Sequence, residues 1–322
     1  MDSDALETFL AVHRRGGVSM AASELSRTQS AISRRLALLE REVGAPLFDR
    51  IGRGLVLSEV GAVLLPYAER AVAAIGDARA AVEAAKSGAA GSVHLAVVGT
   101  LADRTLGRVL WRVGSRFPGI DLRLMTATST EVSEKVRTGE ATIGLRYFED
   151  TSPDLDCRVV RRERLVVACS ASHRFAGKRL RSLDRLAHER WLVFPVPERR
   201  SETFAETILA QFAARGLDRI DTLVIDSLTA QKRLVEAGFG IALLQASAIE
   251  EELARHELAR IRIDDLGVTI AVASVVRRGS YLSAGARALR DELGRARTPS
   301  VHQSAVTDQH DARIAHAGGR RR

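Results

Sequence analysis

The chain has 322 residues, of which 46% are hydrophobic, so it can bury two or three separate cores. Its longest apolar stretches, such as residues 268–276, are far shorter than the roughly 18–20 residues that cross a bilayer, and its two cysteines and scattered histidines exclude a disulfide framework and offer no metal-ligand spacing. The net charge of +8 is uneven: residues 1–60 hold eight arginines and eight acids, whereas residues 158–200 hold twelve basic residues and four acids.

Residues 19–43 predict two short amphipathic helices joined by a tight turn, which is the pattern of a DNA-reading helix-turn-helix. Thr28 is placed to cap the second helix, and Ile32, Leu36 and Leu39 form its inward stripe. The opposite face carries polar side chains suited to base edges in a major groove, namely Gln29, Ser30, Ser33 and Arg34. The alternative is that this face is only a solvated helix surface.

Residues 46–57 contain two short β-prone runs around a glycine turn, with Arg50 and Arg53 near the tip. This pattern predicts a wing that follows the helix-turn-helix. Arginines at a wing tip can enter a minor groove or pair with phosphate, although both side chains could equally be solvated.

Together these segments make the chain resemble the LysR-type transcriptional regulators. The resemblance covers roughly residues 4–70, and the matching segments are Ala21-Ala22-x-x-Leu25, Gln29-Ser30-Ala31-Ile32-Ser33, Leu38-Leu39-Glu40, Gly44-x-Pro46-Leu47-Phe48-x-Arg50 and Leu57-Ser58-x-x-Gly61. It implies a DNA-contacting set of Thr28, Gln29, Ser30, Ser33, Arg34, Arg50 and Arg53. Arg27 departs from the family, which often has an apolar residue in this turn, and we expect it to add a phosphate contact.

Residues 58–86 predict one long helix capped by Ser58. Its apolar stripe has coiled-coil spacing, and its members are Leu64, Ala68, Ala71, Ile75, Ala78, Val82 and Ala85. Pro66 is expected to bend the helix or to mark where regular winding starts. The resemblance implies a linker helix that pairs two DNA-binding heads, so the DNA site would be an interrupted palindrome; the alternative is a helix packed on its own chain.

After a small-residue hinge at residues 87–91, strands alternate with helices, which predicts α/β winding. Two sets of elements, with crossings near residues 162–165 and 264–268, resemble the two-lobed periplasmic-binding-protein-like effector domain of the family. The predicted fold class is therefore an N-terminal all-α winged helix-turn-helix, a long linker helix and a C-terminal α/β two-lobed domain.

Ligands of parallel α/β sheets gather where strands end and helices begin. The candidate effector-binding residues at these places are Thr100, Leu101, Thr128, Ser129, Arg146, Arg199, Ser201 and Ser227. Each hydroxyl could instead be a helix cap, as the capping-box pattern of Thr128 and Glu131 indicates. Gln245 stands where many relatives have proline, so the loop after residues 238–244 is expected to differ.

We predict four parts: a DNA-binding domain at 1–58, a linker and hinge at 59–90, an effector-binding domain at 91–297 (lobe I at 91–163 and 267–297, lobe II at 164–266), and a disordered basic tail at 298–322. The expected partners are double-stranded DNA, a second copy through the linker helix with a homotetramer as the final assembly, a small polar metabolite as effector, and RNA polymerase. We expect no cofactor, no metal and no membrane contact.

The acidic start at Asp2 and Asp4 is unlike a signal peptide, so a cytoplasmic, nucleoid-associated protein is expected. No nucleophile elbow, phosphate-binding loop or dinucleotide fingerprint occurs, and Gly238-x-Gly240 alone is a weak signal. The sequence therefore predicts a regulator rather than an enzyme; the alternative is a two-lobed solute-binding protein or α/β enzyme with no role in gene regulation.

Overall fold

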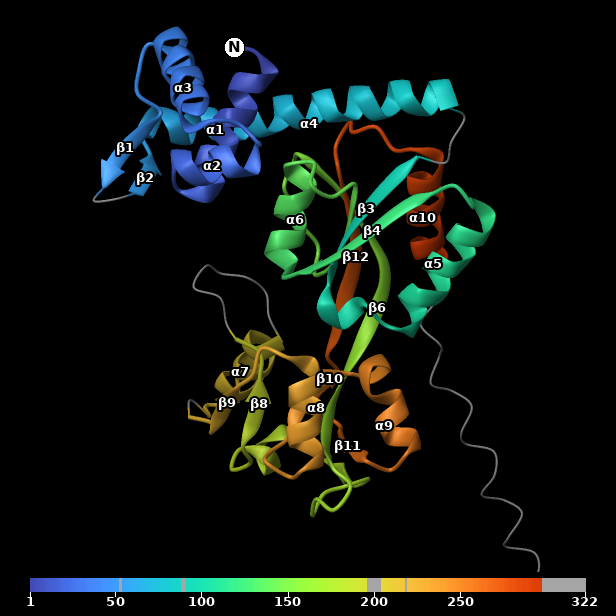
Figure 1. Ribbon diagram of the computed structural model, residues 1–322. Coiled ribbons are helices and arrows are strands. Elements are labelled where there is room, and N and C mark those ends of the chain that lie inside the picture. Colours follow the sequence, from blue (N-terminus) through green and yellow to red (C-terminus); the bar gives the residue numbers. More distant parts are fainter. Residues whose placement is uncertain (52–53, 88–90, 196–203, 218, 297–322) are drawn as a thin grey trace, which may run out of the picture.

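The computed structural model describes residues 1–51, 54–87, 91–195, 204–217 and 219–296. The chain forms a small N-terminal head, a long helix, and two α/β lobes stacked below that helix (Figure 1). No helix in the described part of the chain is long and apolar enough to span a membrane. The predicted tail at 298–322 and most of the hinge lie outside the described residues.

The head contains α1 (Ser3–Arg15), α2 (Val18–Glu24), α3 (Gln29–Val43) and a hairpin of β1 (Phe48–Ile51) and β2 (Gly54–Leu57). Its core is built from one apolar face of each helix, and the rings of Phe9 and Phe48 meet at 5.4 Å between centroids. This architecture confirms the predicted winged helix-turn-helix.

The long helix α4 (Glu59–Ser87) starts at Ser58, whose Oγ accepts a hydrogen bond from Gly61 N at 3.0 Å. It passes through Pro66 as one helix and runs from the head across lobe I (Figure 1). For the first half of the stripe the alternative of a helix packed on its own chain is correct, because Leu64, Ala68 and Ala71 pack into the head core. In the second half Ala78, Val82 and Ala85 are exposed, so the predicted pairing of this part with a partner helix stays a prediction.

Lobe I is a sheet covered by helices on both faces. Its strands lie in the order β4 (Asp121–Ala127), β3 (Ser92–Val98), β5 (Ile143–Tyr147), β12 (Thr269–Arg277) and the first half of β6 (Leu155–Ser170). Its helices are α5 (Arg104–Arg116), α6 (Ser129–Arg137) and α10 (Ala284–Arg295), with the 3-10 turn η1 (Gly99–Leu101) after β3. Parallel β3, β4 and β5 bring their carboxyl ends to the edge that faces lobe II.

Lobe II uses the second half of β6, which pairs with β10 (Ala242–Gln245) and β11 (Leu258–Ile263), while β7 (Arg179–Leu180) pairs with β11. A two-stranded sheet of β8 (Trp191–Val193) and β9 (Thr222–Val224) lies beside it. The helices and 3-10 turns are η2 (Leu183–Leu186), α7 (Phe204–Ala213), α8 (Leu228–Glu236), η3 (Ala246–Ile249) and α9 (Glu250–Ala254). The predicted two-lobed α/β fold is therefore confirmed.

The lobes meet where β6 changes partners. Arg164 pairs with Thr269 of β12, and the next residue, Leu165, pairs with Gln245 of β10. Because β6 is one unbroken strand, the sheet hydrogen bonds continue from one lobe into the other. The sequence pattern predicted a strand at residues 165–169, which is the second half of β6, but it did not predict the first half of β6, nor β7, β11 or α9.

Glu69 of α4 lies half-buried between the head and lobe I. Burial, followed by the nearby negative charge of Glu134, raises the pKa of Glu69 to about 7. An ionised Glu69 therefore opposes the packed state at neutral and alkaline pH.

We expect Glu69→Gln to raise the melting temperature of the full chain at pH 8. Since the folded pKa is about 7 and the ordinary value is 4.5, the difference from wild type should shrink as the pH falls from 7 toward 4.5. Thermal scans across this pH range measure the effect, and Glu83→Gln, at an exposed position of the same helix, is the control. A difference that stays constant with pH would contradict the role of Glu69.

Candidate functional site

The polar face of α3 is fixed by the way the helix starts and packs. Thr28 Oγ1 accepts a hydrogen bond from Ala31 N at 3.2 Å, which confirms the predicted N-cap. Ile32, Leu36 and Leu39 are buried as predicted. This packing leaves Gln29, Ser30, Ser33 and Arg34 exposed, together with Thr28.

Some polar side chains of the head form hydrogen bonds or ion pairs within the head, and others remain available to a partner. Gln29 Nε2 donates to Ser19 Oγ at 2.7 Å and so ties the start of α3 to α2. Arg27 does not point freely to solvent, because it pairs with Asp4 at 3.0 Å, as Arg35 also does. These hydrogen bonds, led by that of Arg35, lower the pKa of Asp4. Within the described residues Arg34 makes no ion pair, so its guanidinium is available to a partner.

The wing places Arg50 on β1, opposite Leu55 of β2, with its side chain exposed. Arg53 lies outside the described residues. The exposed row on α3 and the wing strand thus belong to one small domain.

A cavity of about 1190 Å³ lies between the two lobes, where the carboxyl ends of lobe I strands face α8, α9 and η3 of lobe II. Of the predicted effector residues, Thr100 and Thr128 line it. Ser129 and Ser227 stand next to lining residues but do not themselves line the cavity. Arg199 and Ser201 lie outside the described residues.

The helix-cap interpretation also holds for two of these hydroxyls. Thr128 forms a capping box with Glu131 at the start of α6. Ser227 caps α8 by accepting a hydrogen bond from Ala230 N at 3.3 Å. Thr128 therefore serves as a cap and still lines the cavity.

Two predicted effector residues are placed elsewhere. Leu101 is buried in the core of lobe I, because its side chain points inward from η1. Arg146 is also buried, pairs with Asp150 at 2.7 Å and donates to Ser133 at 3.1 Å. Although burial alone would raise it, hydrogen bonds from Ser133 and Ser152 lower the pKa of Asp150 to about 2, so Arg146 has a permanent internal partner. Both assignments to the cavity wall are wrong.

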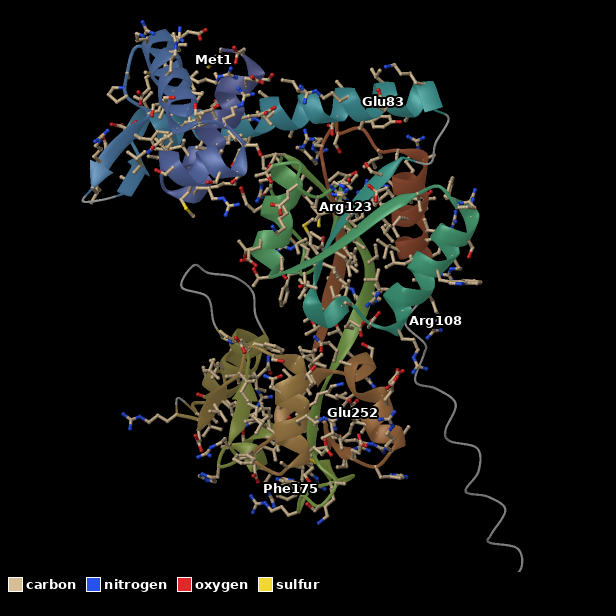
Figure 2. The ribbon with its side chains drawn as sticks, in the orientation of Figure 1. Met1, Glu83, Arg108, Arg123, Phe175 and Glu252 are labelled. Atoms are coloured by element: carbon tan, nitrogen blue, oxygen red, sulfur yellow. The ribbon has the colours of Figure 1, made fainter. Side chains whose placement is uncertain are left out.

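Charged side chains that the sequence reasoning missed also line the cavity. Lys232 of α8 pairs with Glu252 of α9, the residue labelled in Figure 2. Arg104 of α5 pairs with Glu251 and so links lobe I to lobe II. Only the fold brings these residues together, since they come from three separate helices.

A polar cluster joins the lobes beside the cavity. Gln245 Nε2 of lobe II donates to Tyr147 Oη of lobe I at 2.8 Å, and the Tyr147 hydroxyl lies 2.9 Å from Thr100 Oγ1. All but Thr100 are buried. Thr100 and Gln245 were both singled out in the sequence, but their common contact with Tyr147 was not predicted.

The crossing of the lobes also buries an ion pair. Arg161 contacts Glu163 at 2.8 Å and Asp103 at 2.9 Å, and the side chains of Arg161 and Glu163 are only 3% and 2% exposed. Ser247 of lobe II donates to Glu163 at 3.1 Å. A guanidinium at this depth needs its carboxylates, because an unpaired buried charge is strongly unfavourable.

The two cysteines are poorly suited to redox sensing. Burial raises the pKa of the Cys157 thiol and raises that of Cys169 to about 11. A reactive cysteine needs a lowered pKa, so both are expected to remain thiols at neutral pH.

A capped, exposed helix in a winged head, joined to a two-lobed α/β domain with a polar cavity, is the arrangement of a DNA-binding regulator. Comparison with known proteins agrees. Residues 3–62 match the family described as bacterial regulatory helix-turn-helix protein, lysR family, and residues 86–297 match the LysR substrate binding domain. The chain belongs to the LysR family of DNA-binding transcriptional regulators.

The chain is similar to proteins named as transcriptional regulators, and the similarity covers most of their length. The chain is 28% identical to the RuBisCO operon transcriptional regulator of Allochromatium vinosum, over 89% of this chain and 93% of that protein. It is 32% identical to the transcriptional regulator ShiR of Corynebacterium glutamicum, over 74% and 80%. These relatives place the chain among regulators, not enzymes.

Solved structures share the fold. The crystal structure of CbnR, a LysR family transcriptional regulator, is 24% identical, matches with a TM-score of 0.63, and covers 92% of this chain and 99% of that one. Full-length CbnR in complex with its target DNA matches over 92% and 100%, with 24% identity and a TM-score of 0.61.

We expect Glu163→Ala to destabilise the chain by about 3 kcal/mol, because it leaves Arg161 buried with one carboxylate fewer. Urea unfolding followed by fluorescence of the buried Trp191 measures the loss. Asp264→Ala, which removes an exposed partner of Arg179, is the control and should cost less than about 1 kcal/mol. Equal losses in the two variants would mean that the crossing does not depend on this pair.

Proposed function

We propose that this chain binds an interrupted palindromic promoter site as a homo-oligomer and that a small polar molecule in the inter-lobe cavity changes its effect on transcription. The observation that carries the DNA-binding part is the exposed row of amide, hydroxyl and guanidinium groups on the capped helix α3. Phosphate contacts would supply most of the affinity, and this row would select the bases.

The proposed DNA-contacting residues are Thr28, Gln29, Ser30, Ser33, Arg34, Arg50 and Arg53. Arg34 is the strongest of them, because it is exposed on the groove-facing side and has no internal ion pair in the described part of the chain. Arg27, which Asp4 holds, is not proposed as a phosphate contact.

The proposed assembly is a dimer through α4, with two dimers forming a tetramer. Support comes from the exposed apolar side chains that the free face of α4 carries, namely Val60, Val63, Tyr67 and Val82. A two-fold dimer would present two α3 helices to successive major grooves.

The proposed effector contacts are Thr100 and Thr128 in the cavity wall, with Ser129 and Ser227 beside it. Arg199 and Ser201, which lie outside the described residues, are also proposed. Ligand binding would alter transcription only if the ligand favours one arrangement of the assembly over another. We also propose the four-part division at residues 58, 90 and 297, action in the cytoplasm at the nucleoid, and contact with RNA polymerase.

We expect Arg34→Ala to weaken specific DNA binding by about 1–3 kcal/mol, the usual contribution of one good base contact. The melting temperature should not change, because the side chain is exposed. Footprinting on the DNA that flanks the gene measures the affinity. Arg14→Ala, which removes an arginine that Glu24 already holds, should leave the footprint intact; an intact footprint for Arg34→Ala itself would refute the proposed role of α3.

We expect Thr100→Val to raise the effector concentration for half-maximal response about 2- to 10-fold, which corresponds to one lost hydrogen bond. The measurement follows the DNA affinity of wild type and variant as metabolites are added, taken from the pathways whose genes lie next to the gene for this protein. DNA affinity without metabolite should be unchanged, and Ser115→Ala, an exposed hydroxyl on α5, serves as the control. An identical dose curve for Thr100→Val would remove Thr100 from the site.

A further inference from the structure

The helix α4 is anchored at two places along its length. Its first turns are part of the head core through Leu64 and Ala68. Nearer its middle it rests on lobe I, where a Cβ added to Gly139 would lie 3.1 Å from Ala73 Cβ. Head and lobe I are therefore connected by a continuous helix held at both ends of a short span (Figure 1).

The contact between Ala73 and Gly139 is apolar and small, so it allows α4 to approach lobe I but does little to fix its rotation. A directional contact follows one turn later. Arg277 Nη2 donates to Asp77 Oδ2 at 2.8 Å, and the same oxygen accepts a hydrogen bond from the backbone N–H of Tyr281 at 3.3 Å. Two donors from lobe I thus converge on one carboxylate of α4.

This ion pair is better shielded from solvent than the pair at the far end of the same helix. The side chains of Arg277 and Asp77 are 12% and 26% exposed, whereas those of Lys86 and Glu83 are 67% and 71% exposed. Glu83 marks that far end in Figure 2. Exposed pairs contribute little, so of these two pairs only Asp77 with Arg277 can restrain the helix appreciably.

Arg277 also connects α4 to the central sheet of lobe I, because it is the last residue of β12. That strand lies in the middle of the sheet, starts opposite Arg164 where the lobes cross, and ends opposite Leu155. Strands β5 and β6 pair with it on either side, so it cannot bend independently of lobe I. The guanidinium that holds α4 is therefore part of the rigid core of the effector-binding domain.

We propose that Asp77 and Arg277 are positioning residues for DNA binding: the pair fixes the rotation of α4 on lobe I and thereby the separation of the two α3 helices in the assembly. This role rests on the proposed binding of a two-half-site DNA by an oligomer. It adds to that function a named contact through which the effector-binding domain sets the geometry of the heads.

The test uses the full chain and a duplex that the wild-type protein selects from randomised oligonucleotides, prepared with both half-sites and with one. We expect Asp77→Ala and Arg277→Ala to lower the affinity for the two-half-site duplex about 5- to 20-fold, as for a coupling of ordinary size. Binding to the single half-site should remain at the wild-type value. Lys86→Gln, which removes the exposed pair on the same helix, is the matched control and should change neither affinity.

A second measurement separates positioning from simple support of the fold. Selection from a library in which the spacing between half-sites varies should give one spacing for wild type and a broad range for Asp77→Ala. Arg277→Lys, which keeps the charge, should return the selected spacing toward that of wild type. This variant, together with Asp77→Asn, also covers the case in which the alanine variants fail to fold.

Unchanged affinity and spacing in the Asp77 and Arg277 variants would overturn this inference alone. So would equal losses on the single and double half-sites, because the pair would then only stabilise the protein. If wild type itself selected only isolated half-sites, both the proposed oligomeric function and this role would fail.

Discussion

The continuity of β6 is the constraint on which the two-lobed part of the molecule depends. One strand supplies pairing edges to both lobes, and the change of partner falls between Arg164 and Leu165. The lobes therefore cannot separate without breaking a sheet, and any change in the angle between them would fall where the pairing of β6 with β12 gives way to its pairing with β10. The cavity lies beside this place, with Thr100 and Ser247 in its wall, so a molecule bound there would contact both lobes close to their crossing.

The buried charges at this crossing determine how the surrounding segments are arranged more than they add to the stability of the fold. Arg161, Glu163 and Asp103 satisfy one another, but a buried ion pair is often no more stabilising than well-packed apolar residues would be. What the pair does impose is direction, because Asp103 is the N-cap of α5 and Ser247 comes from lobe II. Three segments that are distant in sequence are thus held in one register.

The sequence predicted the head well because its signals are local. A capping threonine and three apolar residues at helical spacing determine which face of α3 is exposed, whatever the rest of the chain does. The same reasoning overextended the stripe of α4, since Leu64, Ala68 and Ala71 have coiled-coil spacing but meet the chain's own head first. Periodicity identifies an apolar face and cannot tell which neighbour covers it.

The cavity was predicted less well because its residues depend on tertiary contacts. The rule that ligands gather at strand ends correctly placed Thr100 and Thr128 at the cavity. Arg146 also lies near the end of a strand, but its ion pair with Asp150 keeps its side chain away from the cavity. The strands β6 and β11 were partly or wholly missed for a related reason. Residues 158–164 hold two valines among four arginines and a glutamate, and two arginines interrupt residues 258–263, so neither segment forms a continuous apolar run. Only pairing with neighbouring strands makes them central to the sheet.

The arrangement of parts also limits how a ligand signal can reach DNA. The head shares its core with the start of α4, and α4 is held on lobe I by Ala73 and Asp77, so head and lobe I behave as one body whenever these contacts persist. A ligand that only closed the lobes would then move lobe II and leave each head where it was. An equilibrium shifts only toward the state that binds the ligand better. For the heads to move, closure of the lobes must therefore change either the contact of α4 with lobe I or a contact of lobe II with another copy of the chain. Strand β12 begins at the crossing of the lobes and ends at Arg277, which holds α4. Within a single chain, the contact of α4 with lobe I is therefore the connection between the crossing and the head.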